Sequence, residues 1–305
     1  MNDLRFALRQ LLKSPGFIAL TVMTLALAPF AAAAPAPLGT VPFKRDGQLM
    51  LVELRIGDAG PVSFFVDSGA SHTVFDSKFA QELGLKIKSA PPTTGTGTGE
   101  VTKSHAEPVV MTLGGVKIDV PEPWVIDLSK APMPASVRGL VGAELFKNYV
   151  VRMDPVQSTF TVFDPASYQH QGDAASLPLL VEGDKLFLEA ELEVPAGKKV
   201  THKLRIDTGS ESSVNDEVVK ESAEVRTSTL GGGLGEQFQS YSGVFTSVKI
   251  GPYKIEHVWG PGGPRPAIGM ELLRRFIVTF DAPHRRMYLE PTPALHDPVP
   301  TPPAS

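Results

Sequence analysis

The sequence predicts an all-β protein made of two similar halves. Glycine and proline are abundant, with 28 residues of each, and this composition favours many short strands joined by turns over a bundle of helices. One pattern of apolar and turn-forming residues also occurs twice along the chain, which indicates a duplicated domain. We therefore expect only a few short helices, and equivalent elements in the two halves.

The first copy of the pattern is centred on residues 64–75. An apolar run, residues 64–66, predicts a buried strand that carries Asp67 onto a tight loop. Ser68 can form hydrogen bonds sideways, and Gly69 lacks a Cβ, so backbone amides can close around the acid. Taken alone, an acid followed by Ser and Gly after a strand is ordinary turn chemistry.

The second copy, residues 204–214, makes the pattern informative. It repeats the order of apolar approach, acid, hydroxyl residue, glycine and small residue. The corresponding positions are Asp207, Thr208, Gly209 and Ser210, where the first copy has Asp67, Ser68, Gly69 and Ala70.

Further motifs repeat at a constant distance. Gly142 and Gly269 each follow an apolar pair, Asp154 and Asp281 each end the next apolar strand, and both pairs lie 127 residues apart. A strand and hairpin also precede each acid loop, at residues 49–54 and 186–192. Because whole supersecondary units repeat, a pseudo-twofold arrangement would bring the two acid loops against each other.

The paired loops resemble those of the pepsin and retropepsin superfamily of aspartic proteases, and residues 45–291 carry the resemblance. Glycine-rich stretches at residues 94–99 and 230–235 fall where that family places its flaps, which favours its retropepsin-like bacterial members. The first stretch lacks a pepsin-type flap tyrosine. The resulting flap and substrate-binding candidates are Gly95, Gly97, Gly99, Gly231, Gly232 and Gly233.

The resemblance implies a bilobal acid-protease fold of two β-barrel-like lobes, with Asp67 and Asp207 as catalytic residues. Two neighbouring carboxylates share a proton, because both cannot ionise cheaply. The ionised acid would activate a water that attacks a peptide carbonyl, and the protonated acid would donate to the oxyanion. In this family pattern Ser68 and Thr208 brace the loops, and no cofactor is needed.

Two further expectations concern the details of these loops. The resemblance also implies that Gly69 and Gly209 leave their amides free to hold the carboxylates. The hydroxyl of Ser210 has no counterpart at Ala70, so we expect it to donate to Asp207 and keep that acid charged in preference to its partner.

The first 36 residues predict a targeting segment. Arg5, Arg9 and Lys13 form a basic front, residues 17–27 carry no charge, and residues 32–34 supply a small-residue cleavage pattern. The alternative is an uncleaved membrane anchor, since about 18 apolar residues make a marginal span. Either way we expect export to the periplasm or beyond, with attachment to the inner membrane as one form of it.

The remaining boundaries follow from composition and the repeat. We expect a first lobe at residues 37–166, a polar linker at 167–175, a second lobe at 176–291 and a disordered proline-rich tail at 292–305. The first lobe should contain a helix in residues 76–84, capped by an Asp, and a strand pair at residues 109–113 and 116–120 around two glycines.

Other chemistries find little support in the sequence. The net charge of −4 gives no footprint for nucleic acid, and the absence of cysteine excludes disulfides, lipidation at an N-terminal Cys and thiol catalysis. The seven histidines, His72, His105, His202 and His257 among them, show no paired spacing for a metal ion. Glu236 stands where a dinucleotide-binding loop would need glycine. We expect a monomer that acts on peptides or unfolded proteins.

Two alternatives remain at the level of the sequence. One is a cell-envelope binding module that keeps the same fold without activity, against which both intact acid motifs argue. The other is a glycosidase with paired carboxylates, which would need neither the glycines nor an internal twofold.

Overall fold

A computed structural model describes residues 34–93, 100–230, 234 and 238–300 of the chain. The described residues from Pro35 onward form one compact unit. The predicted leader lies almost entirely outside the described residues, and so do the six flap glycines. Within the described part, no helix is long and apolar enough to cross a membrane.

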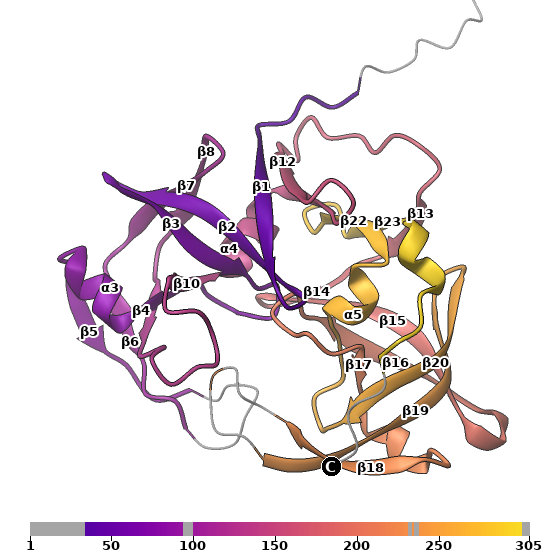
Figure 1. Cartoon of the computed structure of the whole chain (residues 1–305). Coiled ribbons are helices and arrows are strands. Elements are labelled where there is room, and N and C mark those ends of the chain that lie inside the picture. The colour runs from indigo at the N-terminus through magenta and orange to yellow at the C-terminus, as the bar shows by residue number, and fades with distance from the viewer. Residues whose placement is uncertain (1–33, 94–99, 231–233, 235–237, 301–305) are drawn as a thin grey trace, which may run out of the picture. The chain divides into compact units, whose positions relative to one another are not determined.

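The prediction of an all-β fold is confirmed (Figure 1). The described strands form one sheet of fifteen strands and one of eight. The larger sheet contains β1 (Gly39–Asp46), β2 (Leu49–Ile56), β3 (Ala59–Val66), β4 (Val74–Asp76), β5 (Ile87–Ser89), β6 (Ser104–Ala106), β7 (Val109–Leu113), β8 (Val116–Val120), β9 (Trp124–Ile126), β10 (Val137–Val141), β11 (Val150–Asp154), β12 (Thr159–Phe163), β13 (Ala175–Pro178), β22 (Phe276–Asp281) and β23 (Arg286–Pro291).

The smaller sheet is built from the second half of the chain. It contains β14 (Leu180–Glu182), β15 (Lys185–Val194), β16 (Lys198–Ile206), β17 (Val214–Asn215), β18 (Val225–Leu230), β19 (Phe238–Ile250), β20 (Tyr253–Gly262) and β21 (Ala267–Ile268). Helices among the described residues are short: α3 (Ser77–Glu82), α4 (Ala143–Asn148), α5 (Met270–Leu273) and the 3₁₀ turns η1 (Pro195–Gly197), η2 (Glu217–Glu221) and η3 (Pro293–His296).

Two elements of the first half were predicted closely. The predicted strand pair coincides with β7 and β8, which form a hairpin. The predicted helix is α3, and the side chain of Asp76 caps it by accepting hydrogen bonds from the amides of Lys78 and Phe79. Local capping and turn chemistry therefore fixed these elements in the way the sequence indicated.

The equivalent strands β11 and β22 pair directly, and the pairing joins the two halves of the chain. They are antiparallel, with Val151 opposite Phe280, Arg152 opposite Thr279 and Met153 opposite Val278. The central partners, Arg152 and Thr279, are separated by 127 residues, which is the distance of the sequence repeat. An antiparallel register centred on equivalent residues is what a local twofold axis requires. In Figure 1, β1, β12, β22, β23 and β13 lie side by side across this junction.

The strands that lead to the two acids are held in the same way. β3 ends at Val66 and pairs in parallel with β10, while β16 ends at Ile206 and pairs in parallel with β21. The amide of Asp67 then donates to the carbonyl of Val141, and the amide of Asp207 donates to that of Ile268, each over 2.9 Å. Each acid thus follows directly after a strand that is paired with a parallel neighbour, and its own amide is bonded to that neighbour.

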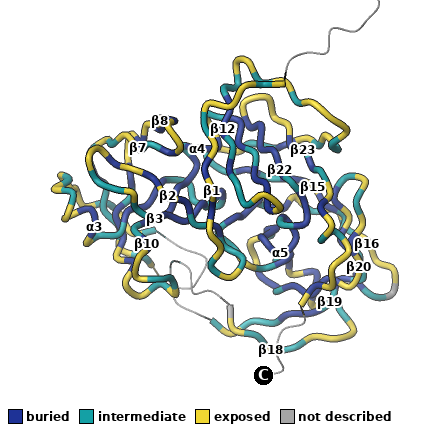
Figure 2. Tube along the Cα trace, turned by 45° about the horizontal axis from the view of Figure 1, so that its top comes forward, coloured by how far each residue is buried: buried dark blue, intermediate teal, exposed yellow. Residues whose placement is uncertain are grey.

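The core explains why these strand ends are rigid. Phe64 and Val66 point into the main hydrophobic core, while Phe65 points to the opposite face of β3, as the alternation of a strand requires. Phe65 belongs to a separate apolar cluster. Its buried members are Phe65, Val74, Ile126, Leu128, Val137 and Leu140, and Leu234 of the second half packs against them. Figure 2 shows buried stretches along the strands and exposed ones at the turns.

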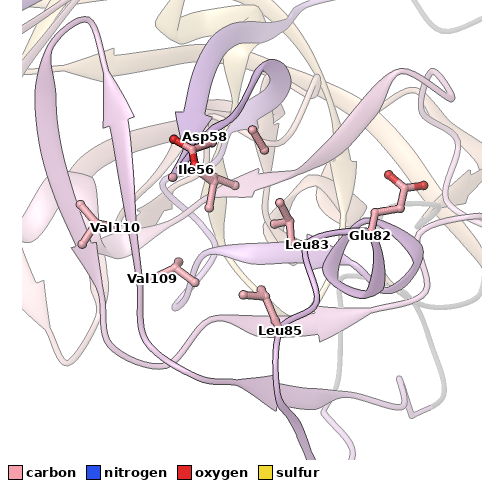
Figure 3. Close-up of a pocket in the computed structure, with 9 residues that line it drawn as sticks. Ile56, Asp58, Glu82, Leu83, Leu85, Val109 and Val110 are labelled. Atoms are coloured by element: carbon pink, nitrogen blue, oxygen red, sulfur yellow. The ribbon is translucent and has the colours of Figure 1, made fainter.

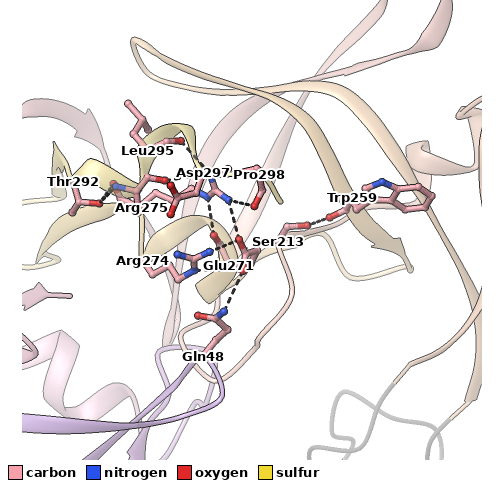
Figure 4. Close-up of polar contacts among 11 residues, drawn as sticks. Gln48, Ser213, Trp259, Glu271, Arg274, Arg275, Thr292, Leu295, Asp297 and Pro298 are labelled. Atoms are coloured by element: carbon pink, nitrogen blue, oxygen red, sulfur yellow. Dashed lines mark hydrogen bonds and ion pairs between the residues drawn. The ribbon is translucent and has the colours of Figure 1, made fainter. Parts of the chain in front are cut away.

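The tail is a correction to the sequence analysis, because residues 292–300 are not disordered. Pro293–His296 form η3, and the side chain of Thr292 caps it by accepting a hydrogen bond from the amide of Ala294. Arg275, which is 0% exposed, donates to carbonyls of this segment at Leu295 over 3.1 Å and at Asp297 over 2.5 Å (Figure 4). A buried guanidinium requires such acceptors, and this requirement orders the chain beyond β23.

Candidate active site

The structure brings the two acid loops together. A Cβ added to Gly69 would lie 2.6 Å from Oδ1 of Asp207, and a Cβ added to Gly209 would lie 2.6 Å from Oδ1 of Asp67. Each carboxylate therefore rests against the glycine of the other loop. Only a residue without a Cβ permits this approach, which gives both glycines a steric reason to be present.

Reciprocal hydrogen bonds connect the two loops. The amide of Ser68 donates to Oγ1 of Thr208 over 2.9 Å, and the amide of Thr208 donates to Oγ of Ser68 over 3.1 Å. Each hydroxyl donates in turn to a backbone carbonyl of the opposite half, Ser68 to Ile206 and Thr208 to Val66, both over 2.9 Å. Both side chains are buried. These four bonds fix the loops against each other in a symmetric way.

The environment of Asp67 favours its neutral form. Burial, followed by the negative charge of Asp207, raises the pKa of Asp67 from 3.8 to about 7. Oδ1 accepts hydrogen bonds from the amides of Gly69, over 2.8 Å, and Ala70, over 3.1 Å. These amide bonds and the Arg205 guanidinium lower the pKa of Asp67, and they offset the first two effects only in part.

Asp207 has a different partner, which sequence reasoning missed. Nη2 of Arg205 donates to Oδ2 of Asp207 over 2.5 Å, and the two side chains are only 14% and 7% exposed. Arg205 stands two residues before its acid, at the position of Phe65 in the first copy. The sequence did contain a signal for this contact, because Arg205 is a charged residue within the apolar strand that leads to Asp207.

The prediction that the hydroxyl of Ser210 donates to Asp207 is wrong. Oγ of Ser210 lies 2.7 Å from Oγ of Ser212, and it also accepts from the amide of Ser212 over 3.3 Å. Ser212 offers a closer partner within the same turn, and Oδ2 of Asp207 is bonded by Arg205 instead.

Two equivalent glutamates support the loops by different contacts. Oε2 of Glu144 accepts hydrogen bonds from both the amide and the hydroxyl of Thr73, which anchors the end of the first acid loop. Glu271, 127 residues later, pairs with Arg274 and Arg275 and also accepts from Nε2 of Gln48 over 3.3 Å (Figure 4). The second glutamate thus ties the second loop region to the first half of the chain.

A hollow elsewhere on the surface takes no part in this site. It has a volume of about 500 Å³ and is lined by Ile56, Leu83, Val109 and neighbouring residues (Figure 3). None of its lining residues belongs to either acid loop. In the part of the chain that is described, no three His, Asp or Glu side chains gather as a metal ion would require.

Comparison with known protein families gives a match for the first half of the chain. Residues 52–145, which include the first acid loop and Glu144, match the family model described as aspartyl protease. A search among curated proteins found no significant match. The family match thus supports a relationship to aspartyl proteases for the first half of the chain, and the geometry above extends the same arrangement to the second acid.

Proposed function

We propose that this protein is an aspartic-type endopeptidase that hydrolyses peptide bonds with a water molecule activated between Asp67 and Asp207. The observation that carries the proposal is the reciprocal approach of the two acid loops, in which each carboxylate rests against the glycine of the other loop. The hydrogen bonds exchanged by Ser68 and Thr208 support a rigid, preorganised pair. The match of residues 52–145 to aspartyl proteases supports the same reaction class.

We also propose a two-lobed architecture for this protein. The pairing of β11 with β22 about equivalent residues supports two lobes related by a pseudo-twofold axis, as in pepsin-like and retropepsin-like enzymes. One chain then supplies both acids, so a monomer suffices. The order of basic, apolar and small residues within residues 1–36 supports export to the periplasm or beyond, with anchoring in the inner membrane by the same segment as the alternative to its cleavage.

The mechanism follows from the different environments of the two acids. Asp207, paired with Arg205, accepts a proton from the water as its oxygen attacks the peptide carbonyl carbon. Asp67, whose pKa is raised to about 7, donates its proton to the carbonyl oxygen. The carbon–nitrogen bond of the resulting diol then breaks as Asp207 gives its proton to the leaving amine and Asp67 takes a proton from a diol hydroxyl. The pair returns to its starting state without a covalent intermediate.

The proposal predicts a bell-shaped dependence of peptide cleavage on pH. Above about 7, Asp67 loses the proton that it must donate, so kcat/KM should fall about tenfold for each further pH unit. At low pH the charged member takes up a proton and the base is lost. The measurement is cleavage of an unfolded protein between about pH 3 and about pH 9, with the products identified by mass spectrometry.

The same experiment separates the alternatives. Cleavage at internal peptide bonds supports an endopeptidase, with the Asp67→Asn/Asp207→Asn double variant as the control that should not cut. Binding of peptides without cleavage at any pH would favour a binding module of the same fold. Release of sugars from polysaccharides, with no peptide cleavage, would favour a glycosidase.

A further inference from the structure

A permanently charged side chain lies against one member of the proposed acid pair. Arg205 donates to Oδ2 of Asp207 over 2.5 Å, and its side chain is only 14% exposed. On β16 it alternates with Leu204 and Ile206, which are buried in the core, so it points to the opposite face of the strand. The equivalent position in the first half is Phe65, which is apolar. Arg205 is therefore bonded directly to one acid only, and the equivalent position of the other half carries no charge.

The contacts of the two acids are accordingly unequal. Asp67 is held by neutral backbone amides at Gly69 and Ala70, whereas Asp207 is held by a guanidinium, which does not lose its proton in proteins. The Nε atom of Arg205 is buried and has no hydrogen-bond partner among the described residues. Asp207 is thus the acid to which Arg205 is directly bonded.

The other charged groups on the surrounding elements have partners of their own. Opposite Arg205 lie Phe187 on β15 and Ala267 on β21, which are uncharged. The remaining charged side chains nearby are engaged as follows: Lys203 with Glu182, Glu211 with the amide of Gln48, and Glu271 with Arg274 and Arg275. The local charge balance of the pair is therefore set by Asp67, Asp207 and Arg205.

We infer that Arg205 is a positioning residue that keeps the negative charge of the pair on Asp207 and the shared proton on Asp67. The inference rests on the proposed function for its role in the reaction, and on the geometry alone for the proton's location. Arg205 assigns the base to the second half of the chain and the acid to the first. By holding Asp207 charged, it also extends activity towards lower pH.

Titration of the full-length protein tests the location of the proton. Carboxyl groups labelled with ¹³C would be followed by NMR, with signals assigned through Asp67→Asn and Asp207→Asn. A positive charge within a few ångströms of a carboxylate changes its pKa by about one to three pH units. In Arg205→Met, the lower of the two apparent pKa values of the pair should therefore rise by about one to three pH units. Arg205→Lys should keep most of the wild-type behaviour.

The matched control is Lys203→Met, which removes a positive charge from the same face of the same strand but from a residue paired with Glu182. It should leave the titration of the pair unchanged. If Arg205→Met does not fold, Arg205→Gln replaces it, since Gln is also neutral and still carries a donor. An unchanged titration in a folded, neutral variant at this position would overturn the inference.

A second readout connects the inference to catalysis. In Arg205→Met the acidic limb of the kcat/KM profile should move to higher pH together with the titration. Below the limb, activity should fall about tenfold for each pH unit by which the limb has moved. If the wild type cleaves peptides but the titration of the pair is unchanged in Arg205→Met, the endopeptidase activity is supported and the proposed role of Arg205 is wrong. A moved titration in a protein that cleaves nothing would keep the inference on the proton and remove the proposed function.

Discussion

Asp67→Asn and Asp207→Asn should each reduce kcat/KM for peptide cleavage by about a thousandfold or more, since general acid–base groups contribute factors of this order. Each change removes one member of the pair, and the remaining acid cannot both deprotonate the water and protonate the carbonyl oxygen. The losses should not add. Once one member is gone, removing the second costs almost nothing further in transition-state stabilisation.

The control for these variants is Asp58→Asn, which removes an exposed acid from the turn between β2 and β3. It should cleave like the wild type. All variants would be compared by circular dichroism and by their unfolding midpoints, so that loss of activity is separated from loss of fold. Substantial cleavage by either folded single variant would contradict the assignment of the pair.

Asp67→Asn should also make the protein more stable at neutral and higher pH. The folded pKa of Asp67 lies above the unfolded value, so between about 4 and about 7 the folded state binds more protons than the unfolded state. The free energy of unfolding therefore decreases as pH rises through this window. The raised pKa corresponds to roughly 2–4 kcal/mol after allowance for the partial exposure of Asp67. Asn avoids this cost while keeping an oxygen that can accept the two amide hydrogen bonds.

Denaturant unfolding at about pH 4 and about pH 8 measures this effect. The stability difference between Asp67→Asn and the wild type should be small at the lower pH and favour the variant at the higher one. Asp207→Asn is the contrasting variant: it should be destabilising, because it leaves the guanidinium of Arg205, whose side chain is only 14% exposed, without its anionic partner. A variant Asp67→Asn that is equally or less stable than the wild type at both pH values would show that the charged form of the acid costs the fold nothing.

Much of the secondary structure could be predicted from the sequence because it depends on local patterns. Glycines at the hinge of β7 and β8 and the Asp cap of α3 specify those elements within a few residues of sequence. The approach of Asp67 to Asp207 was predictable for a different reason. A duplicated motif places equivalent loops about one axis. The room that the glycine in each loop leaves for the carboxylate of the other was not predicted, because it depends on how closely the two loops approach.

The unpredicted contacts depend on which side chains meet in space. Ser210 turned to Ser212 because the turn brings the two hydroxyls together, a geometry that composition does not reveal. Arg275 reaches carbonyls about 20 residues away, which no local pattern encodes, although Thr292 followed by Pro is a recognisable helix start. The pairing of Arg205 with Asp207 could have been predicted in part, because the alternation of a strand places Arg205 on the face opposite Leu204 and Ile206.

The most direct test of the paired acids is the pKa of Asp67 in Asp207→Asn, measured by ¹³C NMR. If the two carboxylates form one unit, removing the charge of Asp207 removes a cause of the raised pKa, so Asp67 should titrate at least about one pH unit below its wild-type value near 7. A pKa of Asp67 that stays near 7 in the folded variant would show that the two acids do not act on each other, and it would contradict the proposed dyad.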